Sequence, residues 1–329
     1  MSQQHPHSHH GEPMPRLSTL QGAALLAEPD RLYAAWRHAL HTNAHLHGPE
    51  AAALLGVPEA ALLASATGRG NQALTGPLSE LLAPVAQWGR VLVASRNGLG
   101  VKLDVLGRAS FQALADGSLL LEDELHHIHL GSEGLARIDL FEEEDGHGRT
   151  LSLNWFDAKG DAVGRLFLMS KSGREEALPW LQRFVLPSAP AHWQPGSQPL
   201  PKLLSLDAVE LGELPAGASA AAWGTAAILS CDAAPTMRLS LSGRGARSQY
   251  AGPLCKTLHT PPAAHATDLL CKLHARPFKA VLAQPLLGGG LQVADGDGGL
   301  LRFEPIGTEA AAWLDQVQQR ALGLMEMPA

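Results

Sequence analysis

The chain has 329 residues, of which 45% are hydrophobic and 17% charged, and its formal net charge is −7. This length and composition predict a globular protein that can bury the cores of two ordinary domains. The negative charge argues against a nucleic-acid footprint. No apolar run reaches the roughly 18 residues that a membrane span needs. The polar N-terminus lacks an apolar export segment, and the few cysteines lack CxxC spacing, so we expect a cytoplasmic protein.

Residues 1–25 form a polar segment with no hydrophobic periodicity. Its histidines lie among Pro, Gly and Gln residues at positions His5, His7, His9 and His10. This composition predicts a disordered tail that binds metal only adventitiously.

Residues 30–70 predict three short helices. Each of the three patterns begins beside a proline, and glycines follow the second and third, which is the asymmetry expected of helix ends. Two short helices around Gly56-Val57-Pro58 could form a helix-turn-helix DNA reader, but the flanking residues include few Arg or Lys, which favours a structural pair. A further helix pattern runs from Leu78 to Trp88.

Strands follow from residue 90. The segments 90–95 and 101–105 alternate around a turn at 96–98, and 117–145 predicts two or three more strands. One of these strands carries three histidines; His127 and His129 share one face, and His126 takes the other. The run Glu142–Gly146 is predicted to be an acidic turn.

Residues 149–168 predict a β-hairpin. Leu151, Leu153 and Trp155 alternate with polar or smaller neighbours, and residues 162–168 form the returning strand. Between the strands, Asp157–Asp161 supplies the reversal, because Asp can bond its own backbone and Gly accepts positive φ.

A proline-rich linker, residues 187–204, separates two related halves. Asp295–Leu301 echoes the turn at Asp157–Val163, and Leu273-His274 echoes Leu125-His126. These echoes predict an α+β fold built as a tandem duplication of a mostly antiparallel sheet unit with flanking helices. The predicted repeats are residues 26–186 and 205–329.

Three stretches of the first half carry a more specific resemblance. They are Leu32-Tyr33-x-x-Trp36 with the helical run Glu50–Ala64, then Trp88-Gly89-Arg90-Val91-x-x-x-Ser95-Arg96-Asn97, and Phe156-Asp157-Ala158-x-Gly160-Asp161-Ala162-Val163. Together they resemble the HemS/ChuS-type haem utilisation proteins, also called haemin-degrading factors. The resemblance implies two pseudo-symmetric halves, a haem ligand, a role in haem and iron uptake, and an uptake transporter or haem oxygenase as partner.

A haem site needs an apolar slot, an iron ligand and cations for the propionates. In the family, the axial His lies on a helix just after the first half; this chain lacks that motif, and its only linker histidine is His192. Other candidates come from positions that match the family's motifs. His127 takes the place of a haem-lining Arg, Tyr250 replaces a His, and His274 and Arg276 match a His and an Arg. The candidate iron ligands are therefore His192, Tyr250 and His274.

Each candidate also has a plainer interpretation. His192 could be an exposed packing residue, the histidine strand a polar face, and Tyr250 a core residue with a satisfied hydroxyl. No catalytic residue is assigned, because Lys102 stands where the family has a His and no motif for hydrolysis or phosphate binding is present. Three hypotheses follow: a haem carrier or buffer, a haem-degrading enzyme, or a decayed paralogue with another ligand or a protein partner.

Overall fold

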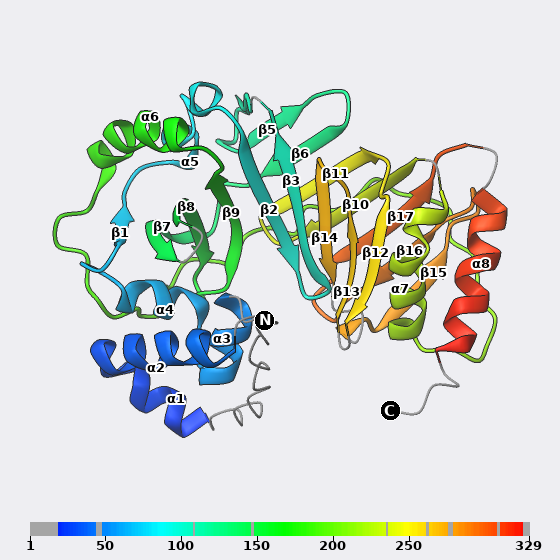
Figure 1. Cartoon of the computed structure of the whole chain (residues 1–329), viewed down its shortest axis with the longest axis horizontal. Coiled ribbons are helices and arrows are strands. Elements are labelled where there is room, and N and C mark those ends of the chain that lie inside the picture. The colour runs from blue at the N-terminus through cyan, green and yellow to red at the C-terminus, as the bar shows by residue number, and fades with distance from the viewer. Residues whose placement is uncertain are drawn as a thin grey trace, which may run out of the picture.

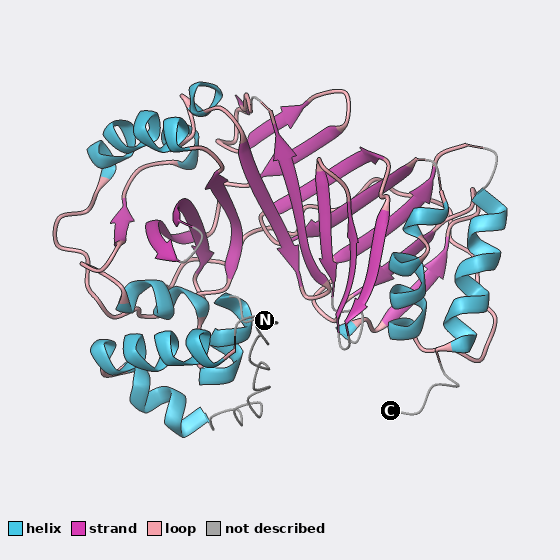
Figure 2. Ribbon diagram, viewed as in Figure 1, coloured by secondary structure: helices cyan, strands magenta, loops and turns pink. Residues whose placement is uncertain are grey.

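Two antiparallel β-sheets form the centre of the molecule, and helices lie against them (Figure 1, Figure 2). The structure is a computed structural model that describes residues 19–43, 48–107, 109–145, 148–234, 236–260, 263–275, 279–307 and 310–324. The α+β class expected from the sequence is confirmed.

Sheet A has nine strands in the order β1-β7-β8-β9-β2-β3-β14-β13-β12. Their bounds are β1 Asn71–Leu74, β2 Val91–Asn97, β3 Gly100–Leu106, β7 Leu135–Asp145, β8 Gly148–Asp157, β9 Ala162–Leu168, β12 Lys256–Thr260, β13 Ala263–Thr267 and β14 Cys271–Ala275. Strand β7 continues through Asp145, so the predicted acidic turn at Glu142–Gly146 is wrong for residues 142–145. They pair with β8.

Sheet B has eight strands in the order β15-β16-β17-β10-β11-β6-β5-β4. Their bounds are β4 Gln112–Ala113, β5 Leu119–Glu122, β6 His126–Leu130, β10 Met237–Gly243, β11 Ala246–Gly252, β15 Leu282–Pro285, β16 Leu291–Ala294 and β17 Leu300–Pro305. Strand β6 places His126 on the buried face and His127 and His129 on the other, which confirms the predicted alternation.

The two sheets repeat one plan. Sheet A from β7 to β12 and sheet B from β15 to β4 have the same succession of strands, with β7, β8, β9, β2 and β3 matching β15, β16, β17, β10 and β11. This equivalence confirms the tandem duplication.

The halves also exchange strands. The meander β12–β14 of the second half joins sheet A through β3, and β4–β6 of the first half joins sheet B through β11. The registers pair Cys271 with Asp104 and His126 with Tyr250. The counterpart of His126 is therefore Cys271, and that of His274 is His129, so the expected match of His274 with His126 is wrong. The boundaries drawn at the linker stay a prediction.

Helices cap the first half and flank both halves. Their bounds are α1 Thr19–Leu26, α2 Pro29–Thr42, α3 Gly48–Leu55, α4 Glu59–Ser65, α5 Leu78–Leu81, α6 Lys171–Leu181, α7 Ala220–Leu229 and α8 Ala310–Gly323, with 3-10 turns η1 Val85–Trp88, η2 Gln182–Phe184 and η3 Cys231–Ala233. The helix predicted from Leu78 to Trp88 is divided, because Pro84 cannot continue it. In the described part of the chain, no helix is both long and apolar enough to cross a membrane.

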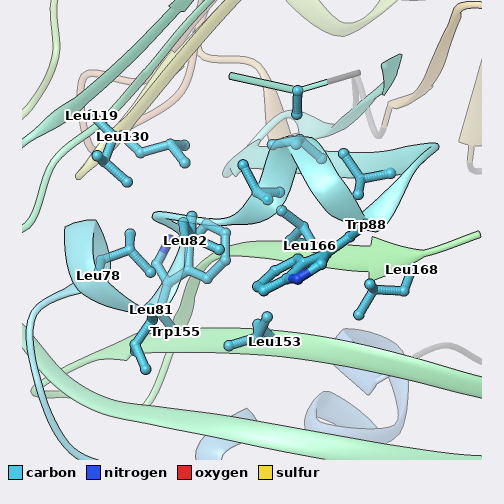
Figure 3. Packing of buried hydrophobic residues seen from close by; sticks show 14 of the residues in the cluster. Leu78, Leu81, Leu82, Trp88, Leu119, Leu130, Leu153, Trp155, Leu166 and Leu168 are labelled. Atoms are coloured by element: carbon cyan, nitrogen blue, oxygen red, sulfur yellow. The ribbon is translucent and has the colours of Figure 1, made fainter. Parts of the chain in front are cut away.

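One core lies between sheet A and the exchanged strands of sheet B. Trp88, Trp155 and Leu166 belong to the same buried cluster as Leu119 and Leu130 of β5 and β6 (Figure 3). A second core joins β10, β17 and β14 to α7 and α8, and a third fills the helical cap formed by α1–α4. The exchanged strands therefore contribute to the cores of both sheets.

A buried charge cluster fastens the helical cap to sheet A. Glu59, at the start of α4, is 3% exposed and forms ion pairs with Arg96 of β2 and Arg165 of β9. Burial lowers the pKa of Arg165 to about 10 and also lowers that of Arg96. Glu59 is thus the anion that lets two arginines lie under the cap.

Candidate functional site

The turn of the β8–β9 hairpin is built around Asp157. Its carboxylate accepts hydrogen bonds from the backbone N–H groups of Lys159 (2.8 Å) and Asp161 (3.0 Å), and Gly160 takes a φ of 84°. Burial raises the pKa of Asp157, although these backbone hydrogen bonds oppose the rise. The turn at Asp295 repeats the same bonds with Asp297 and Gly299.

This turn joins the helical cap to the linker. The N–H of Ala60 in α4 donates to the carbonyl of Gly160 at 2.9 Å, and the N–H of Gly196 donates to the carbonyl of Ala158 at 3.0 Å. A Cβ on Gly160 would lie 2.9 Å from the ring of Trp193, which is itself buried. The turn of the β8–β9 hairpin therefore helps to fix the path of the linker.

The linker is also fastened to the edge of sheet A. The N–H of Leu186 donates to the carbonyl of Ala73 in β1 at 2.9 Å, and Leu74 forms an antiparallel bridge with Val185. Between this attachment and Trp193, the linker borders an open cavity of about 470 Å³. Both linker and strands line it, through Ala73, Leu74, Ala136, Arg137, Leu186, Ala189, Pro190 and residues 192–198. We call it the linker cavity.

His192 is the sequence candidate that the structure places in the linker cavity. Its side chain is exposed, and its Nε2 lies 3.3 Å from the amide nitrogen of Gln194. The packed ring of Trp193 fixes the neighbouring backbone. The imidazole can therefore reach a ligand at the cavity without breaking a core contact.

Arg137 adds a cation to the same cavity. Its guanidinium donates twice to Asp139, at 2.7 and 2.9 Å, and Asn71 donates to the same carboxylate at 3.0 Å. Burial raises the pKa of Asp139, and the hydrogen bonds from Arg137 oppose this rise. Sequence reasoning missed Arg137; the signal was the pair Arg137 and Asp139, two residues apart and therefore on one face of a strand.

The remaining candidates lie elsewhere. Tyr250 is 0% exposed and donates its hydroxyl to the carbonyl of Pro253 at 3.3 Å. His274 lies on β14 directly across from His265 of β13, with ring centroids 4.2 Å apart. Arg276 lies outside the described residues. The structure therefore does not bring the sequence candidates into one site.

His127 is held by two charged neighbours. Its Nε2 lies 2.8 Å from a guanidinium nitrogen of Arg247, and its Nδ1 lies 2.7 Å from the Glu122 carboxylate. Because a guanidinium only donates, Nε2 accepts and Nδ1 carries the proton. His127 can ligate iron only after Arg247 has moved.

Acid should destabilise the fold through His129. Burial, with Arg247 nearby, lowers its pKa below the usual 6.5, while Asp116 acts in the opposite direction. The unfolded chain therefore takes up a proton first, and stability is lost as the pH falls below about 6.5. As the pH falls from about 7.5 to 5.5, we expect the free energy of unfolding of His129→Gln to decrease less than that of the wild type, as measured by urea denaturation.

The matched control is His259→Gln, at an exposed histidine. If the free energy of unfolding of His129→Gln falls with pH as steeply as that of the wild type, His129 is not the group responsible.

The position that carries a family histidine is internal here. Lys102 and Asp104 are both 0% exposed and form an ion pair on one face of β3. In the part of the chain that the structure describes, no three His, Cys, Asp or Glu side chains form a group able to hold a metal ion.

These features define a class: a duplicated α+β protein whose halves exchange strands, with a cavity where the linker crosses the first sheet. Residues 56–182, less than half of the chain, match the model of the haemin-degrading HemS.ChuX domain.

The chain resembles one known protein in sequence over part of its length, and two solved structures in fold. The haemin transport protein HmuS of Yersinia pestis is 29% identical over 141 residues, which are 43% of this chain and 41% of that protein. The structure of holo-PhuS, a haem-binding protein from Pseudomonas aeruginosa, matches with a TM-score of 0.66 at 19% identity, covering 88% of this chain and 98% of the other. The haem-degrading enzyme ChuS from Escherichia coli O157:H7 matches with a TM-score of 0.65 at 17% identity, covering 88% and 99%. At these identities, the two structures show a common fold.

Proposed function

We propose that this protein binds haem in the cytoplasm as a carrier or buffer in haem and iron utilisation, with His192 as the iron ligand. The observation that carries the proposal is the placement of His192 in the linker cavity. The relatives named above handle haem, and the HemS.ChuX domain contains the hairpin turn that anchors this cavity.

The residues at the cavity fit haem. Its volume lies within the 300–1,000 Å³ usual for small-molecule and cofactor sites. Imidazole is a common haem ligand, and Nη1 of Arg137, the guanidinium nitrogen that does not donate to Asp139, can donate to a propionate. Bound haem would supply the redox-active iron. The protein would supply the ligand and the cation, with Leu74, Leu186 and Trp193 as the apolar members of a mixed lining.

The identity and burial of residue 102 favour haem transport over haem degradation. Lys102 stands where the family has a histidine, and its complete burial with Asp104 keeps it from any haem face. The exposure of His192 suits a ligand that must exchange its haem. The second candidate function remains haem degradation, in which the cofactor performs the oxygen chemistry.

Haemin titration tests the proposal. We expect the full chain to develop a saturable Soret band, and His192→Ala to weaken haemin binding by at least about 10- to 100-fold, the cost of losing even an outer-shell partner of a metal ligand. His274→Ala, a histidine on the remote strand β14, is the matched control and should bind as the wild type does. A chain with the four tail histidines replaced by Ala measures the background of residues 1–25.

Three outcomes decide between the hypotheses. No Soret band in the wild type supports a decayed paralogue, and loss of the band in His274→Ala alone moves the ligand to β14. Bleaching of the bound haem after addition of ascorbate supports the enzyme over the carrier.

A further inference from the structure

The outer face of sheet B carries a row of polar side chains that no core contact explains. Arg302 of β17 lies across from Ser240 of β10, which faces Gln249 of β11, which in turn faces His127 of β6. Arg247 lies on the same face, one residue pair further along β11. This row crosses four neighbouring strands.

Residues 201–212 run over this face as an extended strap. At one end, the N–H of Leu204 donates to the carbonyl of Gly243 at 3.1 Å; at the other, the N–H of Gly212 donates to Pro285 at 2.9 Å. Between these points the strap meets the sheet through its own carbonyl groups. Arg247 donates to the carbonyl of Ser205 at 3.1 Å, and Arg302 donates to that of Asp207 at 3.0 Å.

Arg302 lacks the partner that a buried cation usually has. It is 5% exposed, and its side-chain partners are the amide oxygen of Gln292, at 3.0 and 2.7 Å, and the Asp207 carbonyl. Among the described residues, no carboxylate lies within 4.0 Å of its guanidinium. The carboxylates of Glu304 and Asp207 act on it only at longer range. A buried cation whose hydrogen-bond partners are all neutral groups is unusual.

Asp207 lies between the two arginines. Its backbone carbonyl accepts from Arg302, while its carboxylate lies 3.7 Å from the guanidinium of Arg247 and is itself 93% exposed. Ser242 of β10 lies across from Arg247 under the strap. Its hydroxyl is buried and has no hydrogen-bond partner in the described structure. Two guanidiniums and a free hydroxyl are donors that match a carboxylate or a phosphate group.

We infer that this face of sheet B is a binding site for a small oxyanion, a carboxylate or a phosphate, and that the strap covers it with Asp207 as an internal competitor. An anion that reaches Arg302 and Arg247 replaces the strap carbonyls and lifts residues 204–212 from the sheet. The site shares no residue with the linker cavity, so it stands or falls independently of haem binding.

Calorimetric titration of the full chain with citrate and with pyrophosphate, without haemin, tests the inference. We expect Asp207→Asn to tighten binding by about 3- to 10-fold, because a charge that competes for the arginines is removed, and Arg302→Gln to weaken it by about tenfold or more. Glu210→Gln is the matched control: it removes one charge from the same strap, and its backbone carbonyl accepts from the N–H of Leu287 at 3.1 Å, not from either arginine. Arg247→Gln replaces Arg302→Gln if the latter does not fold.

Binding of citrate alone identifies a carboxylate ligand, binding of pyrophosphate alone a phosphate, and either supports the site. Faster amide hydrogen exchange at Leu204 and Gly212 with anion present would show that the strap lifts. The inference is overturned if neither anion binds wild type or Asp207→Asn, or if Glu210→Gln tightens binding as much as Asp207→Asn does.

Discussion

Replacing Glu59 with glutamine is expected to lower the free energy of unfolding by about 3 to 5 kcal/mol, the usual cost of removing one partner from a buried ion pair. The amide is nearly the same size, so packing is retained. The carboxylate that forms ion pairs with Arg96 and Arg165 is lost, and among the described residues no other carboxylate forms an ion pair with either. Both guanidiniums then stay under the cap, with Asp157 and Asp161 acting on Arg96 only at longer range.

Urea denaturation with circular dichroism measures this loss. The control is Glu133→Gln, which breaks the exposed ion pair with Lys202 and should leave the unfolding midpoint almost unchanged. Amides of α4 should also exchange faster in Glu59→Gln, because this ion pair fastens the cap to sheet A. A loss below about 1 kcal/mol would mean that the cluster does not depend on its carboxylate.

Substituting Gly160 with alanine is expected to cost about 2 to 6 kcal/mol, from two causes that add. A side chain at φ 84° is strained by about 1 to 3 kcal/mol. The new Cβ would also lie 2.7 Å from the Cβ of Pro58 and 2.9 Å from the ring of Trp193, so the linker or α4 must move, which costs about 1 to 3 kcal/mol more.

Gly68 separates the two causes. It has a φ of 79°, and a Cβ there would meet nothing within 4 Å, so Gly68→Ala carries the backbone strain alone. We expect Gly160→Ala to be the more destabilised of the two in thermal unfolding, and only this variant to become sensitive to protease between residues 187 and 198. Equal losses in both variants would show that the linker does not rest on the turn.

Local patterns in the sequence predicted local structure well. The hairpin at 149–168 and the alternation of His126, His127 and His129 follow from side chains that repeat every second residue. The short helices of the cap follow from proline and glycine at their ends. The prediction for residues 142–145 was wrong. A run of charged residues is typical of a turn, but here it belongs to a long strand that extends beyond the core.

Long-range pairing could not be predicted in the same way. Nothing in the local sequence of β6 indicates that it joins β11 of the other half. This pairing determines the surroundings of two candidate residues. It places Tyr250 against His126 in the core and brings Arg247 into contact with His127. Arg137 and Trp193 complete the linker cavity through packing between distant segments, which a motif comparison does not detect.

The exchange of three strands affects how the chain folds as it leaves the ribosome. Leu130 of β6 is synthesised early, but its partner on β11 is Ala246. The β11-facing edge of β6 therefore stays unpaired until much of the second half has been made. Pairings of such long sequence separation form slowly, and waiting edges attract other chains. The nascent first half should therefore depend on a chaperone until β11 arrives and closes the sheet.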